Sequence, residues 1–196
     1  MHKLRQKFLR LIVCLVLFSP LSAAHATTVI KVTFPDLVAQ AEVIAVGTVS
    51  EIREQWDAAH EVPLTLVTFT NLTTLKGEPG TSMTLEFLGG PMPNGLIMTI
   101  PGVPRFTVGE KTVVFCAGNQ RSFCPLVGLW QGLLRVAVNP KQNAETVSDS
   151  FRVPIVSIQG GKFVKLSPTN TTQPALSLPA LLQLIQDELR LTADRS

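Results

Sequence analysis

Short runs of β-branched and aromatic residues, each closed by a glycine or proline turn, most constrain how this chain can fold. The 196 residues include 13 glycines and 14 prolines. Runs such as VIAVGTV (43–49), TSMTLEFL (81–88) and KTVVFC (111–116) favour extended backbone, and segments such as KGEPG (76–80) end them. About six to eight strands of this kind predict a mainly β fold, an OB-like barrel or a sandwich.

We expect one helix on each side of this β region. A short N-terminal helix is predicted by apolar residues that recur at helical spacing after a strand-like start: Phe34, Leu37, Val38 and Ala41. A C-terminal amphipathic helix, with Ser177 as its N-cap, is predicted by a longer apolar stripe: Leu178, Leu181, Leu182, Ile185 and Leu189. Such a stripe favours docking of the helix on the core.

The first 26 residues have the pattern of a cleavable signal peptide. Basic residues precede an apolar run at 11–21, and the small-x-small site that follows predicts cleavage between Ala26 and Thr27. The run has eleven residues, whereas a helical membrane span needs about 20. We therefore expect an exported protein, periplasmic or extracellular, with no membrane span after cleavage. The β domain would occupy 27–166, with a polar connector and the closing helix of the same domain at 167–196.

Cleavage of this leader changes the charge balance of the chain. Four of the 17 basic residues lie in the leader and all 14 acidic residues lie after it, so the remaining chain has one more acidic residue than basic. Binding to nucleic acid needs a concentrated positive field. We therefore expect no nucleic-acid partner.

Two cysteines follow the leader, Cys116 and Cys124 in CAGNQRSFC, and we expect them to form a disulfide. An even pair in an oxidising compartment is typical of a structural disulfide, here at the base of a hairpin loop. A redox pair would more often read CxxC, and two thiols supply at most half of a zinc site. A zinc site that adds His60 to the two cysteines would consume this disulfide, which disfavours it.

Several motifs together resemble a family of exported, largely uncharacterised bacterial proteins: FPDLVAQAEVIAVGTV, TTLKGEPG, FLGG, PGVPRFTVGEKTVVF and LVGLWQGLLRV. The resemblance covers most of the chain between positions 34 and 138. The order of helix, glycine-bearing first strand, barrel and closing helix is also similar to the OB-fold modules of netrins and metalloproteinase inhibitors. This similarity implies a fold but no activity, because those inhibitors act through an N-terminal cysteine, and Thr27 is expected at that place here.

Candidate catalytic and metal-binding residues are few. His60 is the one histidine after the leader, and with Asp57 or Glu61 it allows a small secreted hydrolase as an alternative function. A periplasmic copper carrier that uses Met83, Met92 and Met98 is a second alternative, because thioether sulfur is a soft ligand. Methionine also fills gaps in apolar strands, which favours a core role for Met83 and Met98.

The leading hypothesis is a non-enzymatic binding or interaction module without a cofactor, whose partner is an unidentified protein or small molecule. Loops rich in glycine and proline at 89–95 and 101–109 are the surfaces best suited to recognition. Arg105 and Phe106 are the candidate recognition residues in PGVPRFTVGE. The prolines and glycines of this stretch favour a structural turn before the next strand over a recognition tip.

Overall fold

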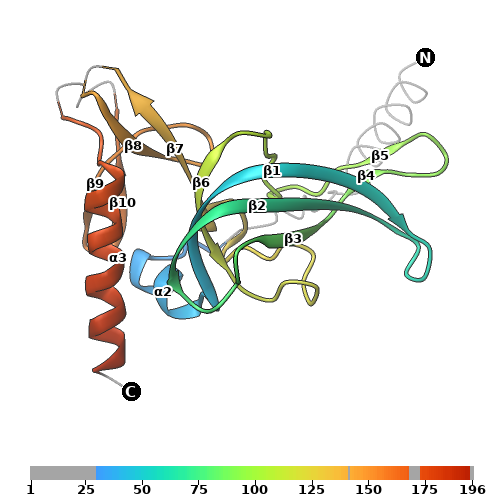
Figure 1. Cartoon of the computed structure of the whole chain (residues 1–196), viewed down its shortest axis with the longest axis horizontal. Helices are drawn as coiled ribbons and strands as arrows, with labels where there is room; N and C mark the ends of the chain where they lie inside the picture. Colours follow the sequence, from blue (N-terminus) through green and yellow to red (C-terminus); the bar gives the residue numbers. More distant parts are fainter. Residues whose placement is uncertain (1–29, 141, 168–172, 195–196) are drawn as a thin grey trace, which may run out of the picture.

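The computed structural model describes residues 30–140, 142–167 and 173–194, and it shows a mainly β protein (Figure 1). The predicted cleavage site at Ala26 and Thr27 lies outside the described residues. Six strands form one antiparallel sheet in the order β3-β2-β1-β6-β7-β8. Their bounds are β1 Val43–Asp57, β2 Val62–Lys76, β3 Met83–Leu88, β6 Lys111–Cys116, β7 Leu133–Asn139 and β8 Ala144–Asp149.

Two small hairpins and two α-helices complete the described chain. The hairpins are β4 (Gly90–Pro91) with β5 (Ile97–Met98), and β9 (Ile155–Gln159) with β10 (Lys162–Lys165). The helices are α2 (Phe34–Gln40) and α3 (Leu178–Ala193). Both predicted helices are thus present, and the predicted runs VIAVGTV, TSMTLEFL and KTVVFC contribute to β1, β3 and β6.

Each helix begins at a side-chain cap and packs its apolar stripe on one face of the sheet. Thr33 and Asp36 form a capping box at α2, and the Ser177 hydroxyl accepts the Ala180 N–H at α3. One core cluster lies between the helices and this face; its most buried members include Leu37, Ile44, Phe115, Leu181 and Ile185. The helices therefore close one side of the sheet and leave the other side to loops.

The second core cluster lies on the opposite face of the sheet. Its members come from the middle of the sheet and from the loops that cross it: Val49, Val67, Phe69, Leu85, Phe87, Val114, Cys116, Cys124, Leu126 and Leu133. In β1, Gly47 lies at a register shift against β2. A Cβ at this position would lie 2.7 Å from Leu72 Cδ2 and 3.2 Å from Phe69 Cβ, so a larger residue would force the Leu72 side chain to move.

The six-stranded sheet is not closed into a barrel, so the barrel form of the prediction is wrong for the described chain. Each edge strand has another hydrogen-bond partner. Beside β3, the Asn119 side chain accepts the Glu86 N–H at 3.0 Å and donates to the Thr84 carbonyl at 2.9 Å. Beside β8, the Val147 N–H donates to the Leu176 carbonyl. Loops thus satisfy the edges that a closed barrel would join to one another.

The alternation of Trp130, Leu134, Val136 and Val138 with polar residues predicts one long strand over VGLWQGLLRVAVNP (127–140), and this prediction is partly wrong. Residues Leu129–Gly132 form a 3₁₀ turn, and β7 begins only at Leu133. The Gln131 side chain explains the turn, because it binds backbone far away in the sequence. It accepts the Val32 N–H at 2.9 Å and donates to the Ile30 carbonyl at 3.0 Å. A straight strand would not hold this amide beside the N-terminal segment.

Cys116 and Cys124 are both buried in the second core cluster, with their thiols unlinked in this structure. Cys116 pairs with Leu126 across an antiparallel bridge. Cys124 lies two residues before Leu126, so the cysteines are diagonal neighbours on the two segments. Burial raises the pKa of the Cys124 thiol to about 11 and raises the pKa of the Cys116 thiol as well. The disulfide stays a prediction that this placement allows.

We predict that oxidised protein has a mass lower by two hydrogen atoms than reduced protein, because Cys116 and Cys124 are linked. The linkage should stabilise the fold by roughly 2.5 kcal/mol through closure of the short loop. In reduced folded protein, alkylation of both thiols should be slow at neutral pH, since little thiolate forms. Intact mass and denaturant titration check this, with Cys116→Ala as the control that cannot cyclise. If protein that was oxidised in air while folded still shows free thiols at both positions once it is unfolded for the assay, the prediction is wrong.

Candidate ligand-binding cleft

The stretch PGVPRFTVGE (101–110) is anchored to the body of the protein by its apolar residues. Phe106 packs on the second core cluster, with its ring centroid 5.6 Å from that of Phe69 and 5.2 Å from that of Phe87. Gly102 has a φ of 89° and lies against the Trp130 ring, where a Cβ would come within 2.7 Å of a ring carbon. The predicted structural turn is therefore built on an aromatic anchor and on a glycine that admits an indole.

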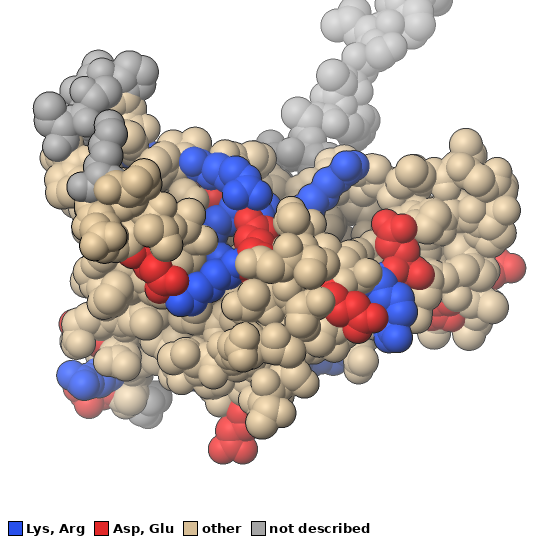
Figure 2. Space-filling model, turned by 45° about the horizontal axis from the view of Figure 1, so that its top comes forward, with Lys and Arg blue, Asp and Glu red and all other residues tan. Residues whose placement is uncertain are grey.

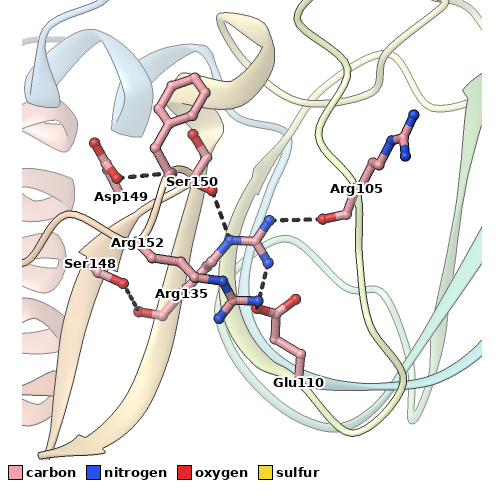
Figure 3. A network of polar contacts seen from close by, with 8 residues as sticks. Arg105, Glu110, Arg135, Ser148, Asp149, Ser150 and Arg152 are labelled. Carbon is pink, nitrogen blue, oxygen red and sulfur yellow. Dashed lines mark hydrogen bonds and ion pairs between the residues drawn. The ribbon is translucent and has the colours of Figure 1, made fainter. Parts of the chain in front are cut away.

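A buried arginine holds the middle and the C-terminal end of the same stretch (Figure 3). Arg135 in β7 is 7% exposed. Its guanidinium forms an ion pair with the equally buried Glu110 and donates to the Arg105 carbonyl at 2.8 Å. The same guanidinium donates from Nε to the Ser150 carbonyl at 2.9 Å. One side chain thus joins β7, the 105–110 loop and the turn after β8.

Glu110 also contacts a second cation, and the turn after β8 has its own carboxylate. The Arg152 guanidinium lies 3.1 Å from Glu110 Oε1. Asp149 accepts the N–H groups of Phe151 and Val153, each at 2.9 Å, and its other oxygen lies 2.5 Å from Lys165 Nζ. These contacts fix the loop backbone that carries Arg105, whereas the Arg105 guanidinium points away from the network (Figure 3).

Two glycines turn the chain after β3 and set the other loop over the sheet. Gly89 and Gly90 have φ values of 121° and 139°, which strongly favour glycine. The Gly89 N–H donates to the Pro63 carbonyl at 2.9 Å, and its carbonyl accepts the Thr65 hydroxyl at 2.8 Å. The β4–β5 hairpin then projects beside the far part of the β1–β2 hairpin, at the right of Figure 1.

A cleft of about 290 Å³ lies between these elements. One wall is the far part of β1 and β2, and the other is the β4–β5 hairpin with the 103–106 loop. Apolar side chains form most of its lining: Ile52, Val67, Phe87, Met98, Ile100, Val103 and Phe106. A volume close to 300 Å³ is at the lower limit of small-molecule sites. The cleft suits a small ligand with an apolar body.

Charged side chains are scarce around this cleft. The sequence has no charged residue from position 87 to 104. Of the lining residues, Glu54 on β1 is acidic and Arg105 is basic, and both are exposed. Elsewhere on the face shown in Figure 2, basic and acidic side chains lie beside one another, with large uncharged areas between them. The cleft is therefore an apolar site with one charge of each sign.

The structure brings the two predicted recognition loops together but changes the role of one predicted residue. Arg105 lines the cleft with an exposed side chain. Phe106 also borders it, but mainly as the anchor on Phe69 and Phe87. The sequence analysis did not identify Ile52 and Glu54, which line the cleft from β1. Their alternate positions on β1 are the signal that could have placed both on one face.

His60 lies at the tip of the β1–β2 hairpin, outside the cleft lining. Its Nδ1 is 2.7 Å from Asp57 Oδ2, and the side chain is 78% exposed. The hydrogen bond between the two side chains, which the Asp57 carboxylate accepts, raises the pKa of His60 and lowers the pKa of Asp57. Asp57 also accepts the Ala59 N–H, so it organises the turn. In the described chain the ring hydrogen-bonds to no serine or cysteine, and a nucleophile–base pair is not assembled.

Two of the three candidate copper ligands, Met83 and Met98, do not converge either. Met83 begins β3, whereas Met98 lies in β5 beyond the other end of β3, about 16 Å further along at strand spacing. Among the described residues, no group of three or more His, Cys, Asp or Glu side chains could hold a metal ion. Met98 instead lines the apolar cleft, and Met83 packs on the second core cluster.

No family model, curated protein or solved structure matches the chain. The interpretation of the cleft therefore rests on its own geometry. Within the described ranges, no helix has the length and apolar character to cross a membrane.

We predict that Arg135→Met lowers the free energy of unfolding by about 3 kcal/mol, because Glu110 loses its buried partner and the loop loses its anchor. The exposed pair of Arg121 with Glu42 supplies the matched control, and Arg121→Gln should leave the free energy of unfolding close to that of the wild type. Urea titrations of the two variants measure both values. Equal, small losses would contradict a central role for Arg135.

We predict that His60 titrates above its ordinary value of about 6.5. A raised folded-state pKa gives stability that is complete below the unfolded-state pKa and is lost as pH rises through the folded-state pKa. NMR titration of the ring protons measures the shift, and Asp57→Asn should remove it. A wild-type pKa at or below the ordinary value would show that the Asp57 contact is not formed in solution.

Proposed function

We propose that this chain is an exported, non-enzymatic binding protein, and that its ligand occupies the cleft between the β1–β2 hairpin and the loops at 89–106. The single observation that carries the proposal is the cleft itself, an apolar hollow of about 290 Å³. Its loop wall is held by features that a simple connection would not need: the Gly89–Gly90 bend and the buried Arg135 anchor. Fixed loops around an open apolar site are typical of ligand recognition.

The export and family assignments belong to the same proposal and rest on the sequence. The basic and apolar pattern of residues 1–26 supports export, and the proposed disulfide of Cys116 with Cys124 suits an oxidising compartment. The order of α2, a β1 that contains Gly47, and a closing helix α3 supports an OB-like order of elements around an open sheet.

The proposal is tested with N-phenyl-1-naphthylamine, an uncharged fluorescent probe that brightens in apolar sites. Wild-type protein should enhance its emission while it still unfolds cooperatively. Met98→Trp fills the cleft and should reduce the affinity at least tenfold. Leu96→Trp, at the exposed tip of the same hairpin, is the matched control and should bind as wild type does.

Either of two results would contradict the proposed site. One is wild-type protein that does not bind the probe. The other is equal binding by Met98→Trp and Leu96→Trp, which would place the probe elsewhere.

A further inference from the structure

The cleft has one unpaired charge on each of its two walls. Glu54 lies on β1 and Arg105 lies on the loop opposite, and both are in the cleft lining. Among the described residues, no ion pair joins them and neither side chain has another ionic partner. A carboxylate and a guanidinium are thus both available to a ligand at the same opening.

The other arginines near the loops are already engaged. Arg135 and Arg152 contact Glu110, and Arg121 lies 2.6 Å from Glu42. Arg105 differs because its backbone is fixed, through its carbonyl to Arg135 and through its neighbour Phe106, while its guanidinium is left exposed. A fixed backbone lowers the entropy cost of presenting such a charge to a ligand.

Glu54 is placed by the pairing of β1 with β2. It lies opposite Thr65, and Ile52 lies opposite Val67, on the face that lines the cleft. The Thr65 hydroxyl donates to the Gly89 carbonyl, so it is occupied with the neighbouring loop. The Glu54 carboxylate therefore lies beside the apolar lining of the cleft, and the Thr65 hydroxyl does not donate a hydrogen bond to it.

The volume of the cleft limits the size of the ligand. About 290 Å³ corresponds to the volume of roughly ten water molecules in the liquid. One apolar amino acid, or a dipeptide that extends into the open mouth, has this size. Larger acyl chains would exceed the enclosed space.

We infer that the ligand of the cleft is a small zwitterion with an apolar body, an apolar amino acid or dipeptide, whose carboxylate binds Arg105 and whose ammonium binds Glu54. This inference rests on the proposed binding function and specifies its ligand class. An anion without an ammonium group would leave Glu54 uncompensated beside a negative ligand, and a cation without a carboxylate would do the same to Arg105. Only a ligand with both charges complements both walls.

The test is isothermal titration of the folded protein with four probes. L-leucyl-L-leucine and free L-leucine carry both charges and distinguish the two sizes. N-acetyl-L-leucyl-L-leucine lacks the ammonium, and L-leucyl-L-leucinamide lacks the carboxylate. At least one of the two zwitterions should bind, and each blocked peptide should bind about tenfold more weakly than the dipeptide, because it loses one charge-assisted contact.

Two cleft variants assign the charges to their partners. Arg105→Gln should weaken the zwitterion and the acetylated peptide about tenfold and leave the amide unchanged. Glu54→Gln should weaken the zwitterion and the amide and leave the acetylated peptide unchanged. Arg53→Gln, next to Glu54 but on the other face of β1, is the matched control and should change none of them.

The possible failures are distinguishable. If neither zwitterion binds, or a blocked peptide binds as tightly as leucyl-leucine, the zwitterion class is wrong; uncharged-probe binding that is lost in Met98→Trp would then leave the binding site itself intact. If N-phenyl-1-naphthylamine also fails to bind, both the proposed site and the proposed ligand class are wrong.

Discussion

The buried ion pair of Arg135 with Glu110 is the contact on which the arrangement of the loops depends. A buried pair adds little stability of its own, because the cost of removing two charges from water offsets their attraction. Here Glu110 Oε2 is buried without a hydrogen-bond partner among the described residues, so the compensation is incomplete. The pair instead fixes the positions of the loops. Each guanidinium nitrogen of Arg135 has its own partner, so three separate segments are held by one side chain.

This geometry has a consequence for the cleft on the same face of the sheet. With the 105–110 loop held by Arg135 and by Phe106, the Arg105 side chain is the charged group of PGVPRFTVGE that lines the cleft. The opposite wall needs no such anchor because the β1–β2 hairpin is a continuation of the sheet. The third side is set by Gly89 and Gly90, whose backbone angles are unfavourable for other residues. A rigid loop, a strand pair and a glycine bend therefore enclose an apolar space whose mouth carries opposite charges.

The helices and most strands could be predicted because their signals are local. The spacing of Leu37, Val38 and Ala41 and the cap at Ser177 depend on neighbouring residues alone, and the structure confirms both helices. The strand through Trp130 was mispredicted for the opposite reason. Gln131 binds the backbone of Ile30 and Val32, about a hundred residues earlier, and no pattern within the segment records that contact.

The sequence by itself determined the mainly β character, the two helices, the turn-forming nature of residues 101–110 and the position of the glycine- and proline-rich loops. It did so because hydrophobic period, capping residues and glycine or proline turns act over a few residues. Only the tertiary structure decided that the sheet stays open, that Arg135 is buried against Glu110, and that Glu54 faces the Arg105 loop across a cleft. Those outcomes depend on which distant segments pack together, and the free energy of that packing is shared among contacts that no single stretch of sequence contains.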